Sequence, residues 1–195
     1  MKSGTINNYK DINKEIGREK IIIGRGTTFT DVTSKVYLWE TLDNTTEKSN
    51  LIFKNFISVA SKCNFILGGN HRYDWFCQSL LINHSNIKID EIISNGDIVI
   101  GNDVWIGYNS TILSGTYIPD GCVIGANSTV NGYKFEPYDI IVGNPGKVIK
   151  KRFDKENIDI LLKLKWWDWD DEKIKKNSHI LKSNDIEKLK EIINE

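Results

Sequence analysis

The sequence has no excess of either charge, because 26 basic residues balance 26 acidic ones among its 195 residues. A chain without net charge has no overall field that attracts nucleic acid, so binding of DNA or RNA is not expected. No apolar run reaches the length that spans a membrane, and the polar residues 1–4 do not begin a signal peptide. We therefore expect a cytoplasmic protein without a membrane span.

Cysteine is also scarce, and its spacing is irregular. Cys63, Cys77 and Cys122 do not form the even, closely spaced set that is typical of a disulfide framework. They predict reduced thiols, which again favours the cytoplasm. Cys122 is interpreted as a small buried apolar residue rather than a nucleophile.

An aliphatic residue recurs at every sixth position in the stretch from residue 98 to residue 130. The positions are Ile100, Ile106, Ile112, Ile118, Ile124 and Val130. A helix needs apolar residues every three to four positions, and a half-buried strand needs one every second position. A period of six instead fits short strands joined by tight turns. Three such strands form a triangular coil of about eighteen residues, and the coils stack.

Small and polar residues fill most positions between these aliphatic residues. Gly101, Gly107 and Gly125 each follow one of them directly, and Asn102 and Asn109 lie close by. Glycine and asparagine adopt positive φ at the lowest cost, so we expect these residues to form the turns between strands.

The same spacing occurs earlier in the chain, in a different frame. Ile23 and Phe29 lie six apart, and the frame returns at Phe53, Val59 and Phe65. The next position is His71, where the pattern stops until Ile100, which is out of frame by one. Long loops inside compact folds are uncommon and tend to be functional. We therefore predict an excursion from the coils over residues 68–97.

These patterns divide the chain into three parts. Residues 1–20 are predicted to form a loosely attached lead-in or a short helix, and residues 21–150 the stacked coils with their excursion. Residues 151–195 are predicted to be a helical tail, whose first helix Asp154 can cap.

Five short segments together carry a resemblance to a known family. They are Asn70-His71-Arg72, GNDVWIG at 101–107, GNPGKVI at 143–149, KRF at 151–153 and LKWWDW at 164–169. In this order they resemble the hexapeptide-repeat acetyltransferases of the xenobiotic type, which include chloramphenicol and streptogramin O-acetyltransferases and relatives that acetylate cell-surface sugars. The resemblance covers about residues 51–175 and, weakly, 21–50. It implies an all-β fold, a left-handed parallel β-helix with an extended loop and a C-terminal helical segment.

The resemblance implies that His71 is catalytic. The family transfers an acetyl group from acetyl-CoA to a hydroxyl, which is a poor nucleophile while it keeps its proton. A neutral imidazole can remove that proton and later protonate the departing thiolate. The alternative is an ordinary loop histidine whose ring is satisfied by its neighbours.

The resemblance also implies a homotrimer whose active sites lie between subunits, with acetyl-CoA in the groove between them. Trp105 would border the thioester, or else pack against a tail helix. Backbone groups of the coils would contact the pantetheine arm, and cations after the GNP turn would meet the phosphates. The candidate donor contacts are Trp105, Ser114, Gly125, Ala126, Lys147, Lys150 and Arg152.

The residues that begin the excursion are candidates for contact with the acceptor. Aromatic rings stack on a sugar or a drug, and polar side chains bind hydroxyls. The candidates are Asn70, Tyr73, Asp74, Trp75 and His84. A sugar or glycan hydroxyl is the first acceptor we predict, an antibiotic hydroxyl the second and an amino-sugar nitrogen the third.

Two other classes of protein share a hexapeptide repeat. A catalytically silent β-helix would only assemble or bind, but His71 and Trp105 argue for an enzyme. A carbonic anhydrase needs three histidines around a metal, and the chain has only three in all, one of them in the tail. We therefore predict no metal site.

Overall fold

The computed structural model describes residues 2–5, 15–16, 19–38, 49–78, 93–132 and 134–194 of the chain. Its contacts divide the chain into two compact units, Met1–Lys150 and Lys151–Glu195. The first unit is built from β-strands and the second from α-helices.

Short strands of the first unit follow one another around four successive coils. The first coil contains β3 (Glu19–Ile23), β4 (Thr28–Phe29) and β5 (Lys35–Leu38). The second contains β6 (Leu51–Phe53), β7 (Ser58–Val59) and β8 (Asn64–Ile66). The third contains β9 (Ile98–Ile100), β10 (Trp105–Ile106) and β11 (Thr111–Leu113). The fourth contains β12 (Tyr117–Ile118), β13 (Val123–Ile124) and β14 (Thr129–Val130).

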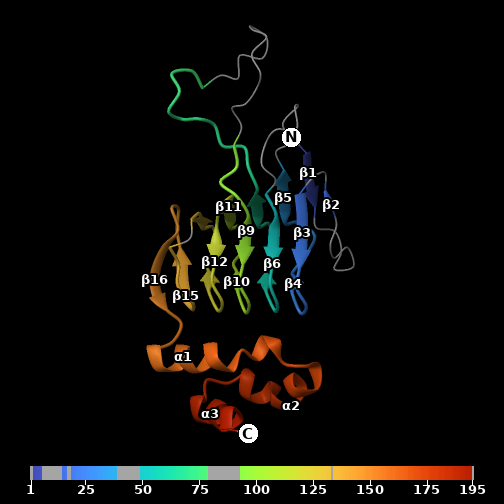
Figure 1. The fold of residues 1–195 in the computed structure, drawn as a ribbon, viewed down its shortest axis with the longest axis vertical. Helices are drawn as coiled ribbons and strands as arrows, with labels where there is room; N and C mark the ends of the chain where they lie inside the picture. Colours follow the sequence, from blue (N-terminus) through green and yellow to red (C-terminus); the bar gives the residue numbers. More distant parts are fainter. Residues whose placement is uncertain are drawn as a thin grey trace. The chain divides into compact units, whose positions relative to one another are not determined.

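Each strand pairs in parallel with the equivalent strand one coil further on, which produces three sheets. They contain β3-β6-β9-β12, β4-β7-β10-β13 and β5-β8-β11-β14 (Figure 1). Ile100 pairs with Ile118, which lies eighteen residues later, and Ile106 pairs with Ile124 in the same way. The predicted three-sided coil is therefore confirmed.

Further strands lie at the edges of these sheets. β15 (Asp139–Val142) pairs in parallel with β13, and β16 (Lys147–Lys151) follows beside it. At the other end, β1 (Lys2–Thr5) pairs antiparallel with β5, and β2 (Glu15–Ile16) pairs antiparallel with β3. The described parts of the predicted lead-in are thus edge strands rather than a helix, because the open sheet edges offer them backbone partners.

The aliphatic residues of the six-residue pattern form the interior of the coils. All six, from Ile100 to Val130, are 0% exposed. A second interior row lies two residues earlier in each repeat, directly before the strand begins, where the side chain faces the same way as the aliphatic residue two positions later. It contains Val104, Ser110, Thr116, Cys122 and Ser128, all buried. Most of this row could not be predicted from the sequence because its members are mainly small or polar, and Cys122 alone was predicted to be buried.

The glycines that follow the aliphatic residues do not adopt the positive φ that we predicted for them. A Cβ on Gly107 would lie 2.6 Å from Ala126 N, and one on Gly101 would lie 2.7 Å from Asp120 N. These positions therefore hold glycine because the backbone of the next coil passes close by. Positive φ falls two residues after each glycine, at Asp103 (52°), Asn109 (56°) and Asn127 (57°). The prediction is therefore confirmed for Asn109 but is wrong for Asn102, where the following Asp103 takes the positive φ.

The second unit contains three α-helices and a short 3₁₀ segment. They are α1 (Lys155–Leu164), η1 (Trp166–Asp168), α2 (Asp171–Leu181) and α3 (Ile186–Asn194). Asp154 accepts a hydrogen bond from Asn157 N at 2.9 Å, so its predicted role as the cap of α1 is confirmed. The all-β label therefore applies only to the first unit. Among the described residues, no helix combines the length and the apolar character that crossing a bilayer requires.

Candidate active site

The predicted excursion leaves the coils after β8 and returns to them at β9. Asn70 and Ile93 form an isolated antiparallel bridge, with backbone N–H···O distances of 3.0 and 2.8 Å. This bridge holds the start and the return of the excursion next to each other. The structure describes residues 68–78 and 93–97 of it.

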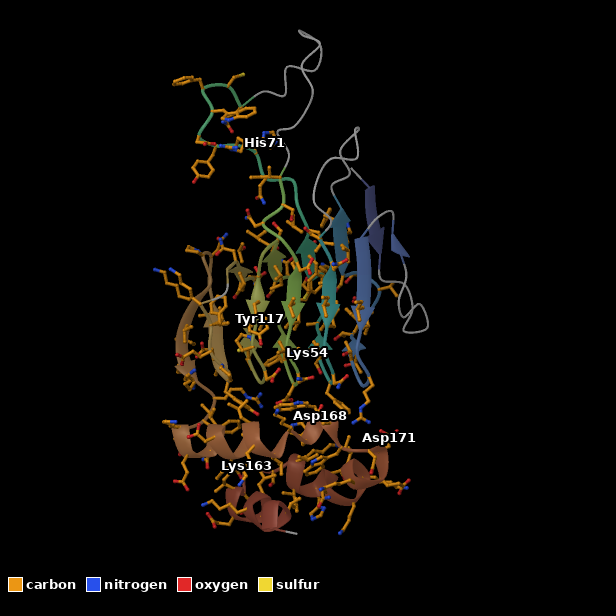
Figure 2. The ribbon with its side chains drawn as sticks, in the orientation of Figure 1. Lys54, His71, Tyr117, Lys163, Asp168 and Asp171 are labelled. Carbon is orange, nitrogen blue, oxygen red and sulfur yellow. The ribbon has the colours of Figure 1, made fainter. Side chains whose placement is uncertain are left out.

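His71 is the first residue beyond that bridge, and its side chain is exposed. Its backbone carbonyl accepts a hydrogen bond from Tyr73 N at 2.9 Å, which starts a tight turn. Figure 2 shows His71 where the excursion leaves the coils, whereas the labelled Tyr117 lies among the strands. The imidazole is thus held close to the coils by its backbone and is open to a substrate.

The next residues are joined mainly to one another. Arg72 donates two hydrogen bonds to the Asp74 carboxylate, at 3.0 and 2.8 Å, and its guanidinium carbon lies 5.7 Å from the Trp75 ring centroid. The hydrogen bonds from Arg72 lower the pKa of Asp74 and raise that of Arg72. Gln78 donates to the carbonyls of Arg72 and Trp75, at 3.0 Å each. This segment is therefore a compact local turn.

The predicted acceptor contacts fall into three groups. Tyr73 and Trp75 present exposed rings, at 91% and 42%, and the Trp75 ring also contacts the Arg72 guanidinium. Asp74 is exposed but already engaged by Arg72, and Asn70 is engaged at the base of the loop. His84 lies outside the described residues.

Trp105 begins β10 and is 56% exposed. It pairs with Ser58 on one side and Val123 on the other, and its exposed ring lies on the outer face of the sheet. The bend before Trp105 joins β9 to β10, whereas His71 follows the bend after β8. A single chain therefore places these two side chains at different corners of the coil.

The other predicted donor contacts lie on different elements. Ser114 is buried at the bend after β11, and Ala126 is exposed at a bend after β13. Gly125 donates its N–H to Ile141 O at 2.8 Å and accepts from the Ser110 hydroxyl at 2.9 Å. Lys147 and Lys150 are exposed on β16. Arg152 belongs to the second unit, with its guanidinium carbon 5.2 Å from the Phe153 ring centroid.

The three cysteines are free thiols, as predicted. Cys63 and Cys122 are buried in the coils, and burial raises the pKa of Cys63. Cys77 is exposed in the turn after His71. In the described part of the chain, no three histidine, cysteine or carboxylate side chains are grouped as a metal ion would need.

The residues that hold the base of the excursion were not predicted from the sequence. Ser49 and Ser94 share a hydrogen bond between their hydroxyls, and Asn50 N donates to the Asp97 carboxylate at 2.6 Å. Serine, asparagine and aspartate are common in loops, so these residues gave no distinct signal.

Comparison with known proteins agrees with this arrangement. The family model described as bacterial transferase hexapeptide (six repeats) matches residues 97–132. The chain is 45% identical over 144 residues to a probable macrolide acetyltransferase of Lysinibacillus sphaericus, covering 68% of the chain and 77% of that protein. It is 38% identical over 186 residues to a chloramphenicol acetyltransferase of Klebsiella aerogenes, covering 91% and 86%. The chain belongs to the hexapeptide-repeat acetyltransferases.

A solved structure supports the same assignment for this hexapeptide-repeat acetyltransferase. The maltose O-acetyltransferase of Clostridium difficile 630 is 26% identical, with a TM-score of 0.50, and the match covers 69% of the chain and 60% of that protein. Membership of the family implies that the coils wind left-handed, as the resemblance predicted. It also makes the protein an enzyme that transfers acetyl groups.

Proposed function

We propose that this acetyltransferase moves an acetyl group from acetyl-CoA to a hydroxyl, with His71 as the general base. One observation carries the proposal: His71 is exposed and directly follows the Asn70–Ile93 bridge, at the corner where the excursion leaves the coils. Its backbone is therefore anchored while its ring is accessible, which a base that must reach a substrate proton requires.

The reaction needs one proton to be moved twice. The His71 imidazole removes the proton of the acceptor hydroxyl while that oxygen attacks the thioester carbonyl. When the C–S bond breaks, the imidazolium returns the proton to the sulfur, and the products are an acetyl ester and a free thiol. Such acid–base help contributes about 10² to 10⁴ in rate. The rest comes from placing the two substrates together.

We propose that the donor binds between subunits of a homotrimer. His71 and Trp105 lie at different corners of one chain, so a neighbouring copy is needed to bring the two kinds of residue together. Trp105 offers an exposed ring on a sheet face, and Lys147 and Lys150 offer exposed cations to phosphates.

Two classes of acceptor each have support. The relatives that are 38–45% identical are antibiotic acetyltransferases by name, and the match to one covers 86% of its length. The maltose O-acetyltransferase, at 26% identity, supports a sugar. We therefore place an antibiotic hydroxyl first and a sugar hydroxyl second, which reverses the order predicted from the sequence.

An assay of thiol release from acetyl-CoA tests the base. His71→Ala is expected to lower kcat at least 10²-fold, because the hydroxyl then keeps its proton during attack. His179→Ala, which changes an exposed histidine of α2, is the matched control and should keep full activity. Activity of His71→Ala within threefold of the unsubstituted protein would remove His71 from the mechanism.

A panel of acceptors decides the substrate class. Chloramphenicol, a macrolide, maltose and glucosamine are compared under the same conditions, and products are analysed by mass spectrometry. Hydroxylamine cleaves an ester but leaves an amide, so it separates O-acetylation from N-acetylation. Faster turnover of maltose than of either antibiotic would restore the sugar to first place.

A further inference from the structure

The hydroxyl of Ser114 lies at the bend after β11, where it is only 4% exposed. Its two hydrogen-bond donors come from opposite ends of the excursion. Asn70 Nδ2 donates to Ser114 Oγ at 3.1 Å, from the residue directly before His71. Asn95 N donates to the same oxygen at 3.3 Å, from the segment that returns to β9. One buried oxygen on the next coil therefore holds both ends of the loop.

Neighbouring contacts fix the returning end of the loop in the same place. The Ser94 hydroxyl donates to Leu67 O at 2.7 Å, and Gly96 N donates to that hydroxyl at 3.2 Å. Gly115 N, adjacent to Ser114, donates to Gly96 O at 2.9 Å. These bonds and the Asn70–Ile93 bridge form a closed base, which we call the neck (Asn70, Ile93, Ser94, Asn95 and Ser114).

We propose that Ser114 is a positioning residue that acts on His71 through Asn70. The inference rests on the proposed role of His71 as the base. Residues 72–78 are joined mainly to one another, so their contacts do not place the imidazole relative to the coils. The neck does place the imidazole, because the Asn70 side chain, directly before His71, is hydrogen-bonded to the buried Ser114 hydroxyl of the β-helix. A misplacement of about 1 Å at a reacting group can cost about 10² in rate.

This role differs from the donor contact predicted for Ser114. A residue that binds coenzyme A changes KM for acetyl-CoA when it is replaced, because its contact is made in the ground state. A residue that positions the base changes kcat and leaves KM unaffected. Asn70 is distinguished in the same way from a residue that binds the acceptor.

The test compares kcat and both KM values of Ser114→Ala, Asn70→Ala and the double variant. Each single change is expected to lower kcat about 10- to 100-fold, with both KM values within about twofold. Since both changes break the same link, the double variant should be no slower than the slower single variant within about twofold. Ser114→Thr, which keeps the hydroxyl, should recover most of kcat.

Ser128→Ala is the matched control for stability. Ser128 is 1% exposed, and its hydroxyl accepts a hydrogen bond from Gly143 N at 3.0 Å rather than from a residue of the neck. The Ser128→Ala variant loses an equivalent buried acceptor, but its kcat should stay within twofold of the unsubstituted protein. Hydrogen exchange at Asn95 N–H gives a readout independent of activity, and exchange should be faster in Ser114→Ala.

Two results would overturn the proposal. One is a Ser114→Ala kcat within twofold of the unsubstituted protein, whether or not its KM for acetyl-CoA is raised, and the other is multiplicative losses in the double variant. If His71→Ala is inactive while Ser114→Ala is fully active, the positioning role fails and the proposed base stands. If His71→Ala is active, the proposed base itself fails.

Discussion

The coils and the excursion use hydrogen bonds in opposite ways. At one corner of the coils, Asn55 N donates to Asn102 Oδ1 at 3.0 Å, and Asn102 N donates to Asp120 Oδ1 at 2.7 Å. Each of these bonds joins one coil to the next. In the excursion, Arg72 binds Asp74 two residues away, and Gln78 binds Arg72 O and Trp75 O. The coils are linked to one another, whereas residues 72–78 of the excursion bind mainly one another.

The burial of apolar side chains shows the same contrast. The aliphatic row of the coils is 0% exposed, while Tyr73 and Phe76 in the excursion are fully or almost fully exposed. Stability therefore resides in the repeat, and the accessible side chains lie in the loop that it carries. This division lets a loop change its surface without loss of the core.

The largest expected effect is the loss of a coil interior residue. Ile106→Ala removes a fully buried side chain and should lower the free energy of unfolding by about 2–5 kcal/mol. Phe76→Ala removes a larger side chain from the excursion, but its change should stay within about 0.5 kcal/mol. Urea denaturation followed by circular dichroism measures both. Equal losses for the two variants would contradict the division between coil and excursion.

A smaller loss is expected for the corner hydrogen bonds. Asn102 is 8% exposed, and Asn102→Ala leaves Asn55 N without its side-chain acceptor, at a cost of about 1–3 kcal/mol. Asn64→Ala removes one local bond, from Asn64 Nδ2 to Lys62 O, and should change stability by about 0.5 kcal/mol or less. Thermal unfolding of the two variants measures the difference. If Asn102→Ala is as stable as Asn64→Ala, the corner bonds do not link the coils energetically.

The smallest effect is expected at low pH, where the Arg72–Asp74 ion pair of the excursion is lost. Because Arg72 lowers the pKa of Asp74 below 3.8, their ion pair is intact above that pH and is lost as the pH falls below it. Amide exchange of Trp75 N–H, which donates to Arg72 O, should therefore accelerate only below about pH 3.8. Asp74→Asn should show the faster exchange at every pH without a change in global unfolding. Exchange equal to that of the unsubstituted protein would show that the pair does not hold the turn.

Most of the coil could be predicted from the sequence because each repeat makes the same contacts. The spacing from Ile100 to Val130 gave the three-sided coil, and the frame shift between Phe65 and Ile100 gave the excursion. The roles of Gly101 and Gly107 were misjudged, since the close approach of another coil is not visible in the residues around them.

Less of the candidate site could be predicted. The residue types at His71, Trp105 and Tyr73 were informative, but the placement of His71 and Trp105 at separate corners depends on where each strand ends. The link between Asn70 and Ser114 joins residues 44 apart in the chain, and neither residue type is unusual at its position. No local pattern therefore indicated it.

By itself the sequence determined the repeat, because a period of six specifies one buried side chain per short strand and so the same stacking at every coil. It also determined which side chains are available for chemistry at the break in that repeat. Only the tertiary structure decided which polar groups meet at the neck and which bend carries His71. Those contacts depend on the register between coils, and register is a property of the stacked chain rather than of any one segment.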